Sequence, residues 1–243
     1  MLSIQGVTKF YGTQAALRGA TLPIVPGEVV GLFGANGAGK STLLKSIVGL
    51  MGIHDGWITL DNSPIKEAVY EKIAFITEEG SYFPEMNASE HSEFYEAMLP
   101  RWRAERFVKL IEYFEIAPAK KARTLSKGQR AKLEIAIGMS RGATYILMDE
   151  PFEGKDLFTR RDFLKLMIAI IEPTEAVLIA THQIEEIANF ITRAAVLHEG
   201  KIVGDLPMDA IAEKGLTLVE YIQKQCGVDT NKNDWLVQNI SNE

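Results

Sequence analysis

The feature that most constrains this chain is a glycine-rich turn between an apolar strand and a helix. Residues 34–41 read GANGAGKS and match the pattern G-x-x-x-x-G-K-[ST] in full. The apolar run 29–33 before the turn is typical of a buried strand, and residues 41–48 after it carry leucine and isoleucine at helical spacing. Because the pattern requires this context, the turn predicts a phosphate-binding loop in an α/β fold. A flexible glycine turn without a ligand is the alternative.

The residue types of this loop suit a phosphate for physical reasons. Glycines allow the backbone to curl so that several N–H groups point at one anion, and the positive end of the following helix adds to the attraction. We expect Lys40 to reach the β- and γ-phosphates of a nucleotide, and the Ser41 hydroxyl to be a hard oxygen ligand for Mg²⁺. The expected nucleotide-binding residues of the loop are Gly34, Ala35, Asn36, Gly37, Ala38, Gly39, Lys40, Ser41 and Thr42.

The rest of the chain predicts a mostly parallel sheet covered by helices, because strand patterns alternate with helical ones. Strands are predicted at 73–77, 145–148, 176–180 and 194–197, and helices at 158–171 and 184–190. The first 60 residues read instead as short strands at 3–9, 16–24 and 57–60. Residues 79–123 have few strand signals and read as a helical insertion, with a helix at 104–114. An amphipathic stretch lies at 218–224, and the last fifteen residues are polar and expected to be loosely held.

A second group of candidate residues follows two of the predicted strands. Asp149 and Glu150 come directly after the strand at 145–148, and His182 comes after the strand at 176–180. In an open α/β sheet, ligands lie outside the carboxyl ends of the strands. We therefore expect Asp149 to hold Mg²⁺, Glu150 to polarise the attacking water, and His182 to contact the γ-phosphate. An acidic pair that caps a helix and a structural histidine are the alternatives.

Residues 125–129, LSKGQ, mark the start of a further helix. Ser126 and Gln129 have the S-x-x-Q spacing of a capping box, and the plain interpretation ends there. A more specific interpretation is that this helix N-terminus is a second anion-binding site. The five residues concerned are Leu125, Ser126, Lys127, Gly128 and Gln129.

The composition of the chain limits its possible functions and cellular settings. The chain has 243 residues, of which 47% are apolar, and a formal net charge of -6, which argues against sequence-independent binding of nucleic acid. Cys226 is the only cysteine, so no intrachain disulfide is possible and a cytosolic setting is expected. We find no signal peptide and no apolar run near the roughly 20 residues that a membrane helix needs. A membrane component would then be another chain.

Together these motifs resemble the nucleotide-binding subunit of an ATP-binding cassette (ABC) transporter, over residues 2–212. The order is specific: the phosphate loop, then LSKGQ, then Asp149, which lies 23 residues after Ser126 (149 − 126), then His182. The resemblance implies a P-loop NTPase fold: a RecA-like, mostly parallel core with an antiparallel β subdomain (together 1–78 and 140–215) and an inserted α-helical subdomain (79–139). The tail is 216–243, and all of it forms one ABC ATPase domain.

The resemblance also implies that two subunits face each other head to tail, each ATP lying between the Lys40 loop of one and the Ser126 motif of the other. It implies that Tyr11 stacks on adenine near Ala16, that Asp156 contacts the partner subunit, and that the helical insertion docks a coupling segment of a membrane partner. Hairpin packing is the alternative for Tyr11. The expected location is the cytoplasmic face of the cell membrane, with permease subunits as separate chains and no nucleic acid.

The chain departs from the family pattern at three positions. Glu78 stands where glutamine is usual, so its role as a Mg²⁺ ligand is open, because a carboxylate adds negative charge beside the γ-phosphate. Lys127 stands where glycine is commoner, and is either a cation for the partner's γ-phosphate or a solvated charge. Lys155 replaces the usual leucine before Asp156.

The expected activity is hydrolysis of ATP coupled to transport, and the subfamily features favour export in bacteria. One alternative is a cassette ATPase acting on a macromolecular partner without a membrane subunit. Such proteins usually carry two cassettes or a long coiled coil, and this sequence has neither. A small-molecule phosphotransferase is the other alternative, and it leaves Ser126 and His182 without a role.

Overall fold

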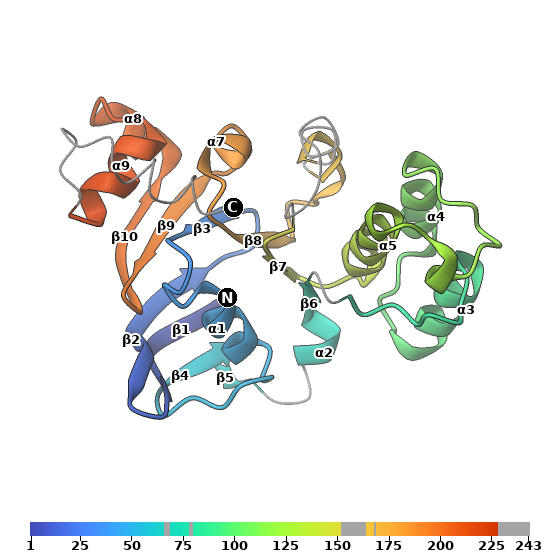
Figure 1. The fold of residues 1–243 in the computed structure, drawn as a ribbon, viewed down its shortest axis with the longest axis horizontal. Coiled ribbons are helices and arrows are strands. Elements are labelled where there is room, and N and C mark those ends of the chain that lie inside the picture. Colours follow the sequence, from blue (N-terminus) through green and yellow to red (C-terminus); the bar gives the residue numbers. More distant parts are fainter. Residues whose placement is uncertain (66–68, 78–79, 152–163, 168, 228–243) are drawn as a thin grey trace.

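The computed structural model describes the chain except for residues 66–68, 78–79, 152–163, 168 and 228–243 (Figure 1). Its centre is a six-stranded sheet in the order β10-β9-β3-β8-β7-β6. The bounds are β3 Val29–Phe33, β6 Ile73–Ile76, β7 Tyr145–Asp149, β8 Ala176–Thr181, β9 Arg193–His198 and β10 Lys201–Pro207. All of these strands pair in parallel except β10, which runs antiparallel to β9. β3 and β8 are continuous apolar runs because both faces of the sheet are covered.

The register of this sheet places three loop starts at one edge. Phe33 pairs with Thr181, and Asp149 pairs with Ala180, one residue earlier on the same strand. Because the strands are parallel, the residues that follow β3, β7 and β8 emerge side by side. The loop at 34–39, Glu150 and His182 therefore start from the same edge of the sheet.

A four-stranded antiparallel sheet holds the N-terminal part of the chain, in the order β2-β1-β4-β5. Its strands are β1 Leu2–Tyr11, β2 Gln14–Ile24, β4 Asp55–Leu60 and β5 Ser63–Pro64. Helix α1, Lys40–Ile47, shares one buried cluster with both sheets: Leu43 and Ile47 pack with Leu22 of β2 and Leu147 of β7. This burial fixes the start of α1, and with it the loop, between the two sheets.

Three helices lie together at the end of the molecule away from the small sheet (Figure 1). They are α3 Ala88–Met98, α4 Ala104–Tyr113 and α5 Lys127–Ser140, with the short 3₁₀ turn η1 Ala122–Thr124 before α5. We call them the helical unit. Elsewhere among the described residues, α2 Val69–Lys72 lies before β6, and a short helical segment lies at 164–167. Helices α7 Ile184–Ile187, α8 Met208–Glu213 and α9 Leu218–Gln225 pack beside β9 and β10.

The predicted strands are confirmed, most of them within two residues of their bounds. One predicted helix is too long, and one strand was missed. The helix predicted at 184–190 ends at Ile187, because the chain turns there and the amide of Phe190 donates to the Ile187 carbonyl over 2.9 Å. Strand β10 was not predicted: it is an edge strand with Gly204, Asp205 and Pro207, and its pairing is irregular after Ile202. Residues 158–163 and the polar end of the tail lie outside the described part.

Within the residues that the structure describes, we find no helix with the length and apolar character needed to cross a bilayer.

Candidate functional site

The glycine-rich loop closes against neighbouring backbone. Gly39 is the N-cap of α1 and has φ 109°, in the left-handed region. A Cβ on Gly39 would lie 2.5 Å from the carbonyl oxygen of Ala16, and one on Gly34 would lie 2.4 Å from that of Leu197. The N-cap Gly39 has no side chain to cap α1, so the helix presents the positive end of its dipole at the loop. The loop is thus built for an anion bound by the main chain.

Lys40 is held inside this loop. Its side chain is only 6% exposed, and its Nζ donates to the Gly34 carbonyl over 2.7 Å and to the Ala35 carbonyl over 3.4 Å. The same Nζ lies 3.5 Å from Oε1 of Glu150. A buried ammonium group beside the loop provides the positive charge that a phosphate requires.

The two expected magnesium ligands are in contact. The Ser41 hydroxyl donates to Oδ1 of Asp149 over 3.0 Å. Burial raises the pKa of Asp149, and the charge of Glu150 acts in the same direction, while the Ser41 hydrogen bond and the charges of Lys45 and Lys40 lower it. Among the described residues no cluster of three or more acidic, histidine or cysteine side chains could hold a metal alone. The two oxygens would suit Mg²⁺, because this ion usually takes one or two protein oxygens and leaves its other positions to substrate phosphates and water.

Glu150 and His182 form the other half of the site. Nδ1 of His182 lies 3.0 Å from Oε1 of Glu150, the same oxygen that faces Lys40. Glu150 has a positive φ of 44°, and its amide donates to the Ala180 carbonyl over 2.9 Å. This unusual backbone at the end of β7 turns the carboxylate back over the sheet edge. The structure therefore brings Lys40, Ser41, Asp149, Glu150 and His182 together, as expected.

Tyr11 and Ala16 lie beside the loop. The Tyr11 hydroxyl donates to Sδ of Met51 over 2.7 Å and lies 3.5 Å from Oγ1 of Thr42, while about half of the residue is exposed. Ala16 contributes the carbonyl that faces Gly39. The aromatic ring thus stands at the start of α1, where it is open to a ligand.

The Ser126 motif lies elsewhere in the chain. The capping box is present: Ser126 Oγ accepts from the Gln129 amide and Gln129 Oε1 accepts from the Ser126 amide, each over 3.2 Å. Leu125 is buried, whereas Ser126, Lys127 and Gly128 are exposed. Helix α5 belongs to the helical unit, away from α1 (Figure 1). Within one chain the structure does not bring this motif to the Lys40 loop.

The sequence pattern of the ABC transporter family matches residues 17–153. This chain belongs to the ABC transporter family. It is an ATP-binding subunit of that family, an ABC-type ATPase. The ABC transporter ATP-binding protein YtrB of Bacillus subtilis (strain 168) is 28% identical over 236 residues, and the match covers 96% of this chain and 79% of the relative. The lipopolysaccharide export system ATP-binding protein LptB of Haemophilus influenzae is 29% identical over 214 residues, with 84% and 89% covered.

Solved structures confirm the fold class. An ATP-binding subunit of an ABC transporter superposes with a TM-score of 0.79 at 24% identity, covering 99% of both chains. A dimeric cassette in a post-hydrolysis state, bound to ADP and inorganic phosphate, has a TM-score of 0.74 at 24% identity, and covers 86% of this chain and 99% of its own. The P-loop core with an antiparallel β part and inserted helices is therefore established for this cassette.

Two predicted site residues of the cassette, Glu78 and Asp156, lie outside the described residues, and Lys155 lies there too. Two residues near the site were not predicted. Lys45 lies one helical turn after Ser41, and its charge acts on Asp149; this i, i+4 spacing was the available signal. Met51, whose Sδ accepts a hydrogen bond from the Tyr11 hydroxyl, gave no sequence signal, because the two residues are 40 positions apart and only the fold brings them together.

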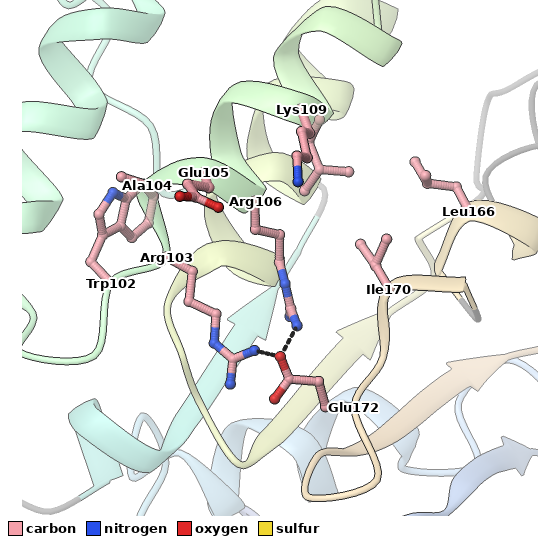
Figure 2. A pocket seen from close by; sticks show the side chains of 10 residues that line it. Trp102, Arg103, Ala104, Glu105, Arg106, Lys109, Leu166, Ile170 and Glu172 are labelled. Atoms are coloured by element: carbon pink, nitrogen blue, oxygen red, sulfur yellow. Dashed lines mark hydrogen bonds and ion pairs between the residues drawn. The ribbon is translucent and has the colours of Figure 1, made fainter.

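The cassette also has a pocket of about 560 Å³ between α4 and the part of the chain that carries Leu166 and Ile170 (Figure 2). Apolar groups of Trp102, Leu110, Leu166 and Ile170 line it, together with Arg103, Glu105, Arg106, Lys109 and Glu172. Arg103 and Arg106 both pair with Glu172. The wall of this pocket is thus built partly by the helical unit and partly by the core.

Proposed function

We propose that this subunit hydrolyses MgATP between two cassettes that face each other, and that the motion drives separate membrane subunits. The observation that carries the proposal is the division of the site. Lys40, Asp149, Glu150 and His182 converge at one sheet edge, whereas the exposed start of α5 lies at a distance within the same chain. A second subunit would supply the missing half.

Binding begins with the nucleotide's phosphates entering the loop, where backbone amides and Lys40 meet them. Lys40 would exchange its bonds to the Gly34 and Ala35 carbonyls for phosphate oxygens. Tyr11 would stack on the adenine, with Ala16 and Thr42 beside it. Mg²⁺, when bound at Ser41 and Asp149, would neutralise charge on the β- and γ-phosphates. Glu78 is proposed as a further ligand of this ion.

Hydrolysis requires a water in line with the γ-phosphate. Glu150 would orient that water and accept its proton, because its carboxylate stands beside Lys40 at the end of β7. His182 holds Oε1 of Glu150 at 3.0 Å and would contact the γ-phosphate. Charge on the phosphate is stabilised by Lys40 and by the partner subunit's α5 terminus.

The partner's contribution would come from the motif at Leu125–Gln129. Ser126 and Gly128 are exposed, and a Cβ on Gly128 would meet no atom of the described residues within 4 Å. The capping box orders the start of α5, and residues 126–128 are exposed there, so that a ligand of the facing subunit could reach them. Asp156 is proposed to contact the other subunit. The dimeric relative with ADP and phosphate supports this arrangement.

The proposed partners are permease subunits at the cytoplasmic face of the membrane. The pocket beside α4 offers apolar walls and the cations Arg103, Arg106 and Lys109 (Figure 2). Because Arg103 and Arg106 already pair with Glu172, the pocket suits a short amphipathic segment chosen mainly by its apolar side chains, and it lies against the helical unit that carries Ser126. Likeness to LptB, which serves lipopolysaccharide export, supports export as the direction. A cassette that acts on a macromolecule without a membrane subunit is the alternative, and co-purification with a membrane chain separates the two.

Glu150→Gln tests the proposal. The variant should bind MgATP but not hydrolyse it, so that the closed pair accumulates. On a sizing column we expect a shift from monomer to dimer that needs MgATP and is absent when Lys40→Ala is added. Bound ATP without any shift would contradict pairing of this chain with itself.

A further inference from the structure

Three buried side chains of the helical unit hold the short segment 80–83, which lies just beyond β6. Glu134 of α5 accepts hydrogen bonds from Ser81, and the Tyr95 hydroxyl of α3 donates to the Ser81 carbonyl over 3.0 Å. The amide of Phe83 donates to Nε2 of His91 over 2.8 Å. The nucleotide site described above uses none of these side chains.

Glu134 makes the most demanding of these contacts. It is only 2% exposed, and its Oε2 accepts from the Ser81 amide over 2.6 Å, while the Ser81 hydroxyl lies 3.0 Å from each carboxylate oxygen. Burial raises the pKa of Glu134, and the Ser81 hydrogen bonds and the charge of Arg141 lower it. A buried acid is costly unless its oxygens are satisfied, so this contact constrains both partners.

The same face of α5 also touches the edge strand of the sheet. A Cβ on Gly138 would lie 2.3 Å from Cγ1 of Ile76, the last residue of β6. Glu134 and Gly138 are four residues apart and so share one side of the helix. One stretch of α5 is therefore fixed to the end of β6 and to the segment that follows it.

This attachment lies between the two halves of the proposed site. On the core side, β6 pairs in parallel with β7, the strand that ends at Asp149. On the other side, Ser126 lies eight residues before Glu134 (134 − 126), or about 12 Å along the helix axis. A small rotation of α5 about Glu134 would displace the exposed Ser126, at the start of the helix, further than it displaces Glu134 itself.

We propose that Glu134 is a positioning residue for ATP hydrolysis: by holding Ser81, it sets the direction in which α5 presents Ser126 to the nucleotide of the facing subunit. The inference rests on the proposed function, since it assumes that Ser126 acts across the pair. Glu134 itself touches no nucleotide. It should therefore affect pairing and turnover while the Lys40 loop keeps its affinity for ATP.

The test compares Glu134→Ala, Ser81→Ala and their double variant with Glu96→Ala, which truncates an exposed glutamate on α3. ATP affinity should be unchanged throughout. Turnover should fall roughly tenfold to a hundredfold in Glu134→Ala, the scale that a displacement of about 1 Å produces, and stay at the original level in Glu96→Ala. The double variant should lose little more than Glu134→Ala, because Glu134→Ala already removes the hydroxyl hydrogen bonds that Ser81→Ala breaks, whereas Ser81→Ala alone keeps the bond from the Ser81 amide and should have the smaller effect. Glu134→Gln, which keeps an acceptor oxygen for the Ser81 amide, should restore most of the turnover even if the alanine variant folds poorly.

The same changes in the Glu150→Gln background separate this inference from the proposed function. If Glu150→Gln pairs with MgATP and adding Glu134→Ala weakens the pairing, the inference is supported. If Glu134→Ala changes neither pairing nor turnover, Glu134 has no positioning role, and the proposal of a site shared between subunits is unaffected. If Glu150→Gln itself never pairs, both proposals fail together.

Discussion

Two glycines show how single residues separate the stability of this subunit from its activity. At Gly39 the backbone has φ 109°, and a Cβ would meet the Ala16 carbonyl at 2.5 Å. At Gly128, near the start of α5, a Cβ would meet no packing neighbour within 4 Å in the part of the chain that the structure describes. The first glycine is required by the fold, whereas the second is required only if another subunit approaches.

We therefore expect opposite effects from the same substitution. Gly39→Ala should lower the free energy of unfolding by about 1–3 kcal/mol and abolish ATP binding, because the loop is strained. Gly128→Ala should leave stability unchanged or raise it by up to about 1 kcal/mol, since alanine favours a helix, yet lower ATP turnover sharply. Urea unfolding and ATPase assays on both variants check this. Full turnover in Gly128→Ala would mean that nothing packs against that position.

His91 should make the folded state sensitive to acid. It is fully buried, its Nε2 accepts from the Phe83 amide and its Nδ1 lies 2.7 Å from the Asn87 carbonyl, so it is held neutral. Burial lowers the pKa of His91 below its usual value. Below about pH 6.5 the unfolded chain then binds a proton at His91 that the folded chain does not. The free energy of unfolding therefore decreases as the pH is lowered, by at most about 1.4 kcal/mol per pH unit.

Unfolding in urea between pH 7.5 and 5.5 measures this dependence. The slope should be smaller in His91→Gln, whose side chain does not titrate, than in the unchanged protein. His198→Gln removes a less buried histidine on β9 and is the control. Equal slopes in all three proteins would show that His91 does not contribute.

At the scale of helices and strands, an ionic cluster joins the helical unit to the core. Arg106 of α4 donates to Oε1 of Glu175 over 2.8 Å and to the Met139 carbonyl over 3.0 Å. Glu175 is 2% exposed and directly precedes β8, the strand that leads to His182. Arg103 also faces Glu175, at 3.5 Å. The cluster therefore ties α4 and the end of α5 to the start of β8.

Arg106→Ala should destabilise the protein by about 3 kcal/mol, because it leaves a buried carboxylate without its main partner. Arg123→Ala removes another ion pair of the same unit, with Glu85 at 3.1 Å, but both of those side chains are more than half exposed. It should cost less than about 1 kcal/mol. Urea midpoints of the two variants give the comparison. Similar losses of stability in the two variants would mean that the buried ion pairs stabilise the fold no more than the exposed pair does.

The sequence predicts some elements well for a physical reason. Strands β3, β7 and β8 are apolar runs, the first followed by the glycine-rich turn and the other two ending in a polar residue, so their type was predictable and their ends were predictable to within one residue. The loop at 34–39, Asp149 and Glu150 were predictable as site residues for the same reason, because they stand where these parallel strands end. Strand β10 could not be predicted, because Gly204, Asp205 and Pro207 disfavour strands and only pairing with β9 orders them.

Contacts between distant elements lie beyond any local pattern. Ser81 and Glu134 are 53 residues apart, and Arg106 and Glu175 are 69 apart. In sequence, Glu134 reads as an ordinary charged residue of a helix, and nothing indicates that it is buried. Its role depends on how α5 packs against β6, which is a property of the folded chain.

At the scale of the whole molecule, one subunit carries two half-sites that do not meet. The Lys40 loop lies between the two sheets, and the Ser126 terminus belongs to the helical unit at the other end (Figure 1). If catalysis joins the loop of one subunit to the α5 terminus of the other, two inactive subunits with different defects should repair each other. No arrangement within a single chain has this property.

Mixing Lys40→Ala with Ser126→Ala subunits tests this most directly. Each variant alone should hydrolyse little ATP, because both of its composite sites are damaged. In the mixed pair one site combines an intact Lys40 loop with an intact Ser126, so an equal mixture should recover up to about a quarter of full turnover by random pairing of a two-fold dimer. Turnover that stays at the level of the separate variants would contradict a site shared between two copies of this chain.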